Sequence, residues 1–394
     1  MKDARGSIEA LRAANRDRVL SALGAVRVAS RSDLARATSL SRTTVASIVA
    51  ELTSSGLVQE SEPDRGSKQG RGRPGTLLSL TRSAGMVAGI DLGHRHVRVA
   101  VADLAGSVVA ERAAELDVDS SPAGALEGVE ELLRSALLEA RTELEALRAV
   151  VSSVPGPLVA SDGTIGSRSL MPRWNGVVLA DELAGRLGRA VAVHNDANLG
   201  ALGELAFGAA AGLEHFVYVK LGFGMGAGIV LDGRLYTGAR GMAGELGHVI
   251  VQENGPVCAC GNRGCLAATV SLRRVLELLQ PAHAEPLGLA DLLDLLADGD
   301  AGARRIVYDT GRSVGAALGD LANCIDPEGV ILGGTLGELG QPIIDGVRAG
   351  LDAHAQPAIA GGIDVRQAAL GARSEVMGAV ALGMSQLTPR APAP

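Results

Sequence analysis

Apolar residues recur with different periods along the chain, and the change divides the sequence into a head and a body. Within residues 41–56, four apolar residues take the i, i+3, i+4, i+7 spacing of one buried helix face: Val45, Ile48, Val49 and Leu52. Apolar groups in residues 19–23 and 32–38 predict two further helices, and Ser32 and Ser41 are suitable helix caps. In the rest of the chain, glycine-punctuated strands alternate with helical patterns.

The polar face of the helix in residues 41–56 suits contact with DNA. Short polar or cationic side chains cover its N-terminal end: Arg42, Thr43, Thr44 and Ser47. A helix-turn-helix presents this end to base edges and phosphates, and the preceding turn has the required length of about three residues. We therefore expect these four residues to bind DNA.

Two strands with a basic tip follow, at residues 57–61 and 76–80. Between them, Arg71 and Arg73 flank a glycine, and such an extended basic segment suits the narrow minor groove. Residues 1–82 carry 14 basic and 8 acidic side chains, whereas the remainder carries 23 and 36. This asymmetry predicts a winged helix-turn-helix domain that binds double-stranded DNA. The alternative is a three-helix interaction module with a disordered loop and a solvated basic face.

The body predicts an α/β fold with two lobes that face a cleft. Residues 87–116 have the pattern of a three-stranded meander, and residues 121–144 have that of a helix. A strand that ends in a glycine-containing turn occurs near Asp91 and again near Gly222. This repetition favours two related lobes.

The composition indicates a cytoplasmic protein that does not bind membranes. Hydrophobic residues make up 47% of the chain but aromatic residues only 2%, so Ala, Val, Leu and Ile must build the cores. Apolar runs are short or interrupted by glycine, which excludes an uninterrupted membrane span. The first residues carry charges throughout and lack the apolar stretch of a secretory signal.

A histidine and three cysteines predict a metal site. His248, Cys258, Cys260 and Cys265 offer one nitrogen and three thiolates, a set suited to tetrahedral Zn²⁺. A disulfide is a poor alternative because cytosolic thiols stay reduced. With four ligands from one loop and no open position, the zinc is expected to be structural.

Several motifs in the body occur in an order that resembles the ROK family, which comprises repressors, open reading frames and kinases. The motifs are PGP at 155–157, HNDANLGALGE at 194–204, LGFGMGAG at 221–228, GELGH at 244–248 and CACGNRGCL at 258–266. The resemblance covers nearly the whole chain and implies a two-lobed, actin-like (ribonuclease H-like) sugar-kinase fold behind a winged head. The first lobe would comprise residues 83–195 with a C-terminal helix at 373–388, and the second lobe residues 196–372. The resemblance points to the same four zinc ligands.

The resemblance also implies a sugar pocket. Asp196 stands where the family keeps its catalytic base, and Asn195 would hydrogen-bond a sugar hydroxyl. Glu245 and His248 would contact further hydroxyls, with His248 also bound to zinc. Considered alone, Asn195 and Asp196 after a strand are more typical of a turn and helix cap than of a binding site.

The sequence departs from the family pattern in three places. The family usually has Glu two residues after the last zinc cysteine, where this chain has Ala267 after Leu266. The second glycine-rich turn usually reads Gly-Thr-Gly, and here Phe223 replaces the threonine. The first turn usually reads Asp-x-Gly-Gly-Thr-Lys, and here the last three residues are replaced: His94, Arg95 and His96.

Both glycine-rich turns are therefore expected to be vestiges of a nucleotide site. Backbone N–H groups can approach phosphates only where residues are small, which the replacements prevent. The vestigial nucleotide-binding residues are Asp91, Gly93, Gly222, Gly224 and Gly333. The alternative is a variant loop that still binds ATP through Arg95.

The leading hypothesis is a sugar-responsive DNA-binding transcriptional regulator, most simply a repressor, with an inactive kinase body. It would bind operator DNA as a homodimer or a dimer of dimers, and Asp196 would be a vestigial base. A second hypothesis is an ATP-dependent, glucokinase-like sugar kinase with a DNA-binding extension, in which Asp196 remains the working base. A third is a regulator triggered by a partner protein.

Overall fold

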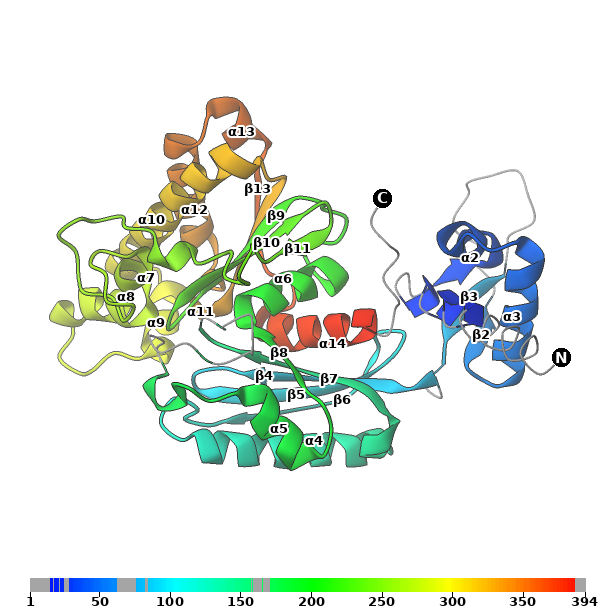
Figure 1. Cartoon of the computed structure of the whole chain (residues 1–394). Coiled ribbons are helices and arrows are strands. Elements are labelled where there is room, and N and C mark those ends of the chain that lie inside the picture. The colour runs from blue at the N-terminus through cyan, green and yellow to red at the C-terminus, as the bar shows by residue number, and fades with distance from the viewer. Residues whose placement is uncertain are drawn as a thin grey trace.

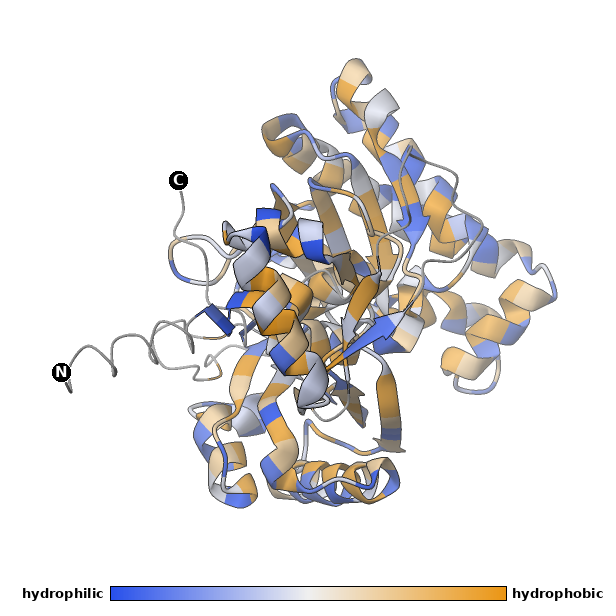
Figure 2. Ribbon diagram, turned by 90° about the vertical axis from the view of Figure 1, so that its right-hand side faces the viewer, coloured by the Kyte–Doolittle hydropathy of each residue, from blue (hydrophilic) through white to orange (hydrophobic). Residues whose placement is uncertain are grey.

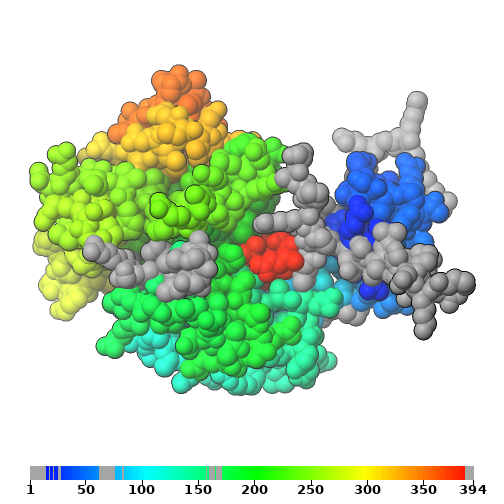
Figure 3. Space-filling model, viewed as in Figure 1, coloured from blue at the N-terminus to red at the C-terminus, as the bar shows by residue number. Residues whose placement is uncertain are grey.

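The computed structural model describes residues 15–16, 18–20, 22–24, 28–61, 76–81, 84–156, 158, 165 and 171–386. It has a small head, drawn in blue at one side of Figure 1, and a larger body whose two lobes lie one above the other in Figures 1 and 3. The head holds a three-stranded sheet, and each lobe holds a five-stranded sheet. These layers of helix and sheet confirm the predicted α/β class.

The head begins with a helical segment in the described residues of 15–24, as predicted for residues 19–23, and continues with two helices joined by a three-residue turn and followed by a hairpin. The elements are β1 Ala29–Ser30, α2 Arg31–Thr38, α3 Arg42–Ser54, β2 Val58–Ser61 and β3 Leu77–Leu80. The middle strand β3 is antiparallel to both neighbours. The two predicted hairpin strands are confirmed. The sequence does not predict the strand β1, because two residues are too few to show an alternation of apolar and polar positions. Arg71 and Arg73 of the predicted tip lie outside the described residues.

The N-terminal cap of α2 corrects one prediction. Ser30, and not Ser32, caps this helix: its Oγ accepts from the backbone N–H of Asp33 at 3.3 Å. The Asp33 carboxylate in turn accepts the backbone N–H of Ser30 at 3.1 Å, which completes a capping box. The cap at Ser41 is confirmed, because its Oγ accepts from the N–H of Thr44 at 3.0 Å.

The two faces of α3 separate as the sequence predicts. The apolar stripe is buried in the head core with Val19 and Leu23 of the preceding segment: Val45, Ile48, Val49 and Leu52. On the other face Arg42, Thr43 and Ser47 are exposed. Thr44 is half-buried, and its hydroxyl lies 2.8 Å from that of Ser41. The N-terminal end of α3 therefore offers polar groups to an external partner.

The first lobe is a sheet in the order β6-β5-β4-β7-β8 with helices on both faces. Its strands are β4 Met86–Leu92, β5 His96–Asp103, β6 Val108–Glu115, β7 Leu147–Val154 and β8 Ala192–Asn195. The first three form the predicted antiparallel meander, and β7 and β8 are parallel to β4. In Figure 1 the helices α4 (Pro122–Ala140) and α5 (Leu179–Leu187) lie below this sheet.

The second lobe repeats the plan with the sheet order β11-β10-β9-β12-β13. Its strands are β9 Phe216–Leu221, β10 Met225–Leu231, β11 Arg234–Tyr236, β12 Gly329–Gly333 and β13 Asp364–Gln367. Its helices are α7 Leu266–Val270, α8 Leu272–Leu279, α9 Leu289–Ala297, α10 Ala301–Ile325, α11 Gly334–Gly337, α12 Gln341–His354 and α13 Pro357–Gly362. Hydrophobic colouring predominates on the central strands in Figure 2. The matching strand orders confirm the prediction of two related lobes.

None of the helices in the described parts of the chain is long and apolar enough to cross a membrane. Even the 25-residue α10 has polar and charged residues along its length and buries only one side.

Two helices cross between the sheets, α6 (Asp196–Phe207) and α14 (Ser374–Gln386), at unusually short range. A Cβ atom added to Gly378 would lie 1.7 Å from the carbonyl oxygen of Leu199. A Cβ atom added to Gly203 would lie 2.1 Å from the carbonyl oxygen of Ser374. Glycine at both positions is therefore what allows the two backbones to meet. Since α14 also packs on β4 and β7, the crossing joins α6 to the first sheet.

Replacing Gly378 with alanine should destabilise the body. The added methyl group must push apart two helix backbones, and such overpacking costs about 1–3 kcal/mol or more. We expect a lower midpoint in thermal and urea unfolding. Gly185→Ala in α5 is the matched control, because an added Cβ there meets nothing within 4 Å. That control should be neutral or gain about 0.5–1 kcal/mol from better helix propensity. Equal midpoints for the two variants would contradict the proposed role of the crossing.

Candidate functional site

A cavity of about 530 Å³ lies between the lobes, where the strand ends of the two sheets face each other. Its walls include the β4–β5 turn at residues 93–96 and the start of α6 at Asn195 and Asp196. Two further segments complete the walls of the cavity: the β9–β10 turn at residues 222–224 and the segment that carries Glu245 and His248. The structure thus brings together the two predicted phosphate turns and the four predicted sugar-binding residues.

Asn195 is the N-terminal cap of α6, as the alternative interpretation of its sequence allowed. Its Oδ1 accepts from the backbone N–H of Asn198 at 3.1 Å, and its Nδ2 donates to the carbonyl oxygen of Gly156 at 3.2 Å. The cap fixes the side chain at the wall of the cavity, where both the amide oxygen and the amide nitrogen keep capacity for one further hydrogen bond.

Asp196 begins α6 and is largely buried, with its carboxylate held by two donors. Oδ1 accepts the backbone N–H of Ala197 at 2.8 Å, and Oδ2 lies 2.9 Å from Nζ of Lys220. Lys220 belongs to β9 and reaches down between the lobes. Its Nζ also lies 3.2 Å from Oε1 of Glu375 in α14, which accepts a further hydrogen bond from the hydroxyl of Tyr218.

Lys220 and the carboxylates around it stabilise one another's charged forms in a largely buried site. Burial alone would lower the pKa of Lys220, but Asp196 and Glu375, with Asp91 behind them, raise it above its ordinary value. Burial raises the pKa of Glu375, and Lys220 opposes that change. Burial also favours the neutral form of Asp91, yet a hydrogen bond from His96 and the charge of Lys220 lower its pKa to about 2. Lys220 and Asp91 are therefore both charged at neutral pH.

The β4–β5 turn is closed by its own side chains. His96 Nε2 lies 2.8 Å from Oδ2 of Asp91, and the hydroxyl of Ser153 donates to the other oxygen of the same carboxylate. A Cβ atom added to Gly93 would lie 2.2 Å from the ring of His96, so glycine is needed for the histidine to fold over the turn. Arg95 points to Asp117, with 3.2 Å between the charged atoms.

The two residues that replace small residues in the predicted phosphate turns meet across the cleft. The rings of His94 in the first lobe and Phe223 in the second are 5.7 Å apart at their centroids and tilted by 52°. Such a geometry is attractive for aromatic rings. His94 Nδ1 is also 2.8 Å from Oδ1 of Asp119, which fixes its ring. Side chains of the protein thus occupy the space between the two turns.

The remaining vestigial glycines have separate roles. In the second turn, the N–H of Gly222 donates to the carbonyl oxygen of Gly224 at 3.0 Å, which keeps the turn tight. Gly333 ends β12 and does not line the cavity. A Cβ atom there would lie 2.2 Å from the hydroxyl of Tyr218, so this glycine makes room for Tyr218.

The four predicted zinc ligands converge. Their ligand atoms all lie within 4.8 Å of one another, and the cysteines are free of disulfides. Cys260 Sγ is 3.7 Å from Cys265 Sγ, and Cys258 Sγ is 3.7 Å from His248 Nδ1. With Zn–S bonds of about 2.3 Å, two sulfur atoms of a tetrahedral site lie about 3.8 Å apart. The residues therefore fit a tetrahedral metal ion.

The orientation of His248 links the metal cluster to the cavity. Nδ1 faces Cys258, whereas Nε2 lies 3.6 Å from Oε2 of Glu245. Burial raises the pKa of Glu245, and His248 opposes the shift. Ala267, where the family pattern has Glu, lines the cavity with only a methyl group. One polar group that the resemblance implies is thus absent from the wall.

Sequence reasoning missed Lys220, Glu375 and Asp119. A signal for the first was present, because Lys220 is a lone cation within the apolar strand FVYVKL, and a buried ammonium needs acidic partners. Glu375 is likewise the lone acidic residue of α14. The pairing of Lys220 with Glu375 could not be assigned, because the two residues are more than 150 positions apart in sequence.

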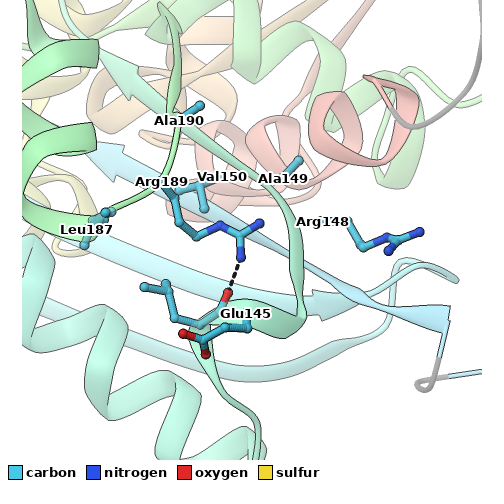
Figure 4. A pocket seen from close by; sticks show the side chains of 9 residues that line it. Glu145, Arg148, Ala149, Val150, Leu187, Arg189 and Ala190 are labelled. Atoms are coloured by element: carbon cyan, nitrogen blue, oxygen red, sulfur yellow. Dashed lines mark hydrogen bonds between the residues drawn. The ribbon is translucent and has the colours of Figure 1, made fainter.

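A second hollow, of about 600 Å³, lies beside β7 and the end of α5 (Figure 4). The guanidinium of Arg189 donates to the carbonyl oxygens of Leu144 and Leu147, and Arg148 points away from it (Figure 4). Since Arg189 is already engaged and the charged groups do not converge, this hollow lacks the features of a ligand site.

The chain is similar to both repressors and kinases. The xylose repressor of Bacillus subtilis is 27% identical over 358 residues, which cover 91% of this chain and 90% of that protein. The glucokinase of Thermotoga maritima is 30% identical over 311 residues, covering 75% of this chain and 96% of that protein. The crystal structure of a ROK family transcriptional regulator, a homolog of the E. coli MLC protein, has a TM-score of 0.75 and 24% identity. It covers 94% of this chain and 96% of that chain.

These likenesses agree with the actin-like, two-lobed fold described above. The family model described as the ROK family matches residues 87–386, which include both lobes and every wall of the cavity. The chain therefore belongs to the ROK family.

Proposed function

We propose that this chain is a sugar-responsive transcriptional repressor, whose head binds operator DNA and whose cleft binds a sugar or sugar derivative. The observation that carries the proposal is the exposed polar end of α3 in a head attached to the ROK body. The likeness to the xylose repressor of Bacillus subtilis over 91% of the chain supports it, because that match is too long to be confined to the ROK body.

The N-terminal end of α3 would enter the major groove. Arg42 has no acidic partner among the described residues, so its charge is free to meet a phosphate or a guanine. Thr43 and Ser47 would contact base edges or phosphates, and Thr44 would hold the helix end through Ser41. Arg71 and Arg73 would reach the minor groove. Two heads are needed to bind two half-sites, so the active form would be a homodimer or a dimer of dimers.

In the cleft, Asp196, Asn195, Glu245 and His248 would bind sugar hydroxyls. Carboxylates accept hydroxyl protons, and Nε2 of His248 and the amide of Asn195 add polar partners on other sides of the ligand. A zinc ion held by His248 and the three cysteines would fix the loop that carries this wall. Sugar binding would favour a closed arrangement of the lobes, change the spacing of two heads, and so change DNA affinity.

The kinase is the second candidate function, favoured by the likeness to the glucokinase of Thermotoga maritima. The contact between His94 and Phe223 argues against it, because two rings take up the space between the turns that would hold phosphates. The body would then have lost phosphoryl transfer and kept sugar binding. The repressor proposal also includes domain boundaries at residues 82 and 195, a first lobe completed by residues 373–388, and a cytoplasmic location.

Arg42→Ala should weaken DNA binding without unfolding the head. The test uses double-stranded DNA selected from a random library by the full-length chain, with affinity measured by gel shift. Loss of one phosphate or base contact should cost about 1–3 kcal/mol, roughly a tenfold or greater loss. Arg305→Ala on α10 is the control, because Arg305 is an exposed arginine of the body. Absence of any enriched sequence, or equal affinity of both variants, would count against the proposal.

Zinc removal should loosen the cleft and leave the head folded. Elemental analysis should find one zinc ion per chain, and Cys260→Ser should lack it, whereas Cys324→Ser, outside the cluster, should retain it. The Cys260 variant should have a lower melting temperature and a weakened stabilisation by sugars. A zinc content that does not depend on Cys260 would refute the assignment.

The wild-type chain should neither bind ATP nor phosphorylate sugars. Replacing His94 with Gly, Arg95 with Thr and Phe223 with Thr together reopens the space between the turns and should increase ATP binding, measured by titration calorimetry. A coupled assay with a sugar panel measures turnover, with Asp196→Asn as the control. Equal ATP affinity of the wild-type and triple-variant chains would contradict the closure of the turns. Sugar phosphorylation that depends on Asp196 would establish the kinase instead.

A further inference from the structure

The floor of the cleft holds an ion cluster centred on Lys220, a residue that none of the predicted sites includes. Lys220 from β9 meets carboxylates from two helices, with Nζ 2.9 Å from Asp196 in α6 and 3.2 Å from Glu375 in α14. Asp91 of β4 lies close enough for its charge to act on the same ammonium. The three acidic side chains are buried or nearly so, and Lys220 lines the cavity.

Three carboxylates cannot stay charged in such a place without a cation. Buried carboxylates are paired with a cationic side chain, coordinate a metal ion, or take up a proton. Here His96 and Ser153 satisfy Asp91, but Asp196 and Glu375 have Lys220 as their shared cation. The ammonium thus neutralises two carboxylates that would otherwise bind a metal ion or take up a proton.

The same ammonium has a hydrogen-bonding group left for a ligand. It carries three N–H donors, and two are directed to Asp196 and Glu375. The side chain is 22% exposed, on the side of the cavity. Next to this donor, the free lone pairs of the Asp196 carboxylate are acceptors. A donor and an acceptor side by side match one uncharged hydroxyl group, which both accepts and donates.

We propose that Lys220 is an effector-binding residue and the built-in cation of the cleft, so that an uncharged sugar binds here without a metal ion or a nucleotide. The proposal deepens the proposed function: it names the group that binds a sugar hydroxyl together with Asp196. It also explains why the cleft can receive a sugar after the phosphate turns are closed by His94 and Phe223. The charge balance of the sugar end does not depend on anything bound at those turns.

The test removes the ammonium group of Lys220 by substitution and supplies Mn²⁺ as a replacement cation. In the zinc-loaded, full-length Lys220→Met variant, the carboxylates of Asp196 and Glu375 face each other without a counterion. We expect this variant to bind one Mn²⁺ per chain in titration calorimetry and by electron paramagnetic resonance, because oxygen ligands suit such a hard cation. The wild-type chain should show no such Mn²⁺ site. Arg273→Met is the matched control, because Arg273 lines the same cavity but pairs with Glu277 instead.

Sugar binding is measured in the same variants by thermal shift with D-xylose and D-glucose, with and without added Mn²⁺. For a sugar that stabilises the wild-type chain, the shift should be unaffected by Mn²⁺, lost in Lys220→Met and partly retained in Lys220→Arg. A wild-type chain that binds Mn²⁺ as Lys220→Met does, or a folded Lys220→Met chain that binds no Mn²⁺, would overturn the proposal.

If Lys220→Met does not fold, the readout is its refolding yield with and without Mn²⁺. Rescue by Mn²⁺ supports the built-in cation, and no rescue contradicts it. Mn²⁺ binding is measured without DNA, so this result is independent of the selection experiment on the head. A failure of the repressor proposal and a failure of this one are therefore distinguishable.

Discussion

The neutralisation of buried carboxylates by Lys220 constrains the whole body. One ammonium joins β9 of the second sheet to α6 and α14, and α14 rests on the first sheet. Breaking a buried ion pair by removing one partner costs far more than losing an exposed one, because an unpaired charge remains in a poorly polar environment. Moving the lobes apart at Lys220 would therefore carry an electrostatic cost. The proposed sugar-binding end of the cleft lies around this residue.

The same architecture accounts for both repressors and kinases among the relatives. In each lobe, the turn of the first hairpin lines the cleft. A few side chains determine whether the space between these two turns is open or filled. Small residues would leave the space open. His94 and Phe223 instead place rings there that contact each other, and Asp119 holds one of them. Binding and chemistry are thus separable in this fold, since the residues proposed to bind the sugar belong to other elements.

Much of the fold follows from the sequence because its signals are local. Four features depend on residues near one another in the chain: the stripe on α3, the cap at Ser41, the meander of the first lobe and the convergence of the predicted zinc ligands. The sequence predicts Ser32 as the cap of α2, two residues after the observed cap Ser30. Both serines are suitable caps until the hydrogen bonds between Ser30 and Asp33 are considered. The cluster around Lys220 was out of reach, because its members come from four separated segments and no periodic pattern marks them.

The glycine crossing of α6 and α14 has a consequence for the order of synthesis. Helix α14 follows every other described helix in the chain, so it leaves the ribosome after them. Until it arrives, Gly203 lacks the helix that packs against it, Lys220 lacks Glu375, and the first sheet lacks one covering layer. The head is translated first, but its buried residues share one hydrophobic cluster with Val376 and Val380 of α14. Translation of this last described helix would therefore complete both the cleft and the cluster that joins the head to the body.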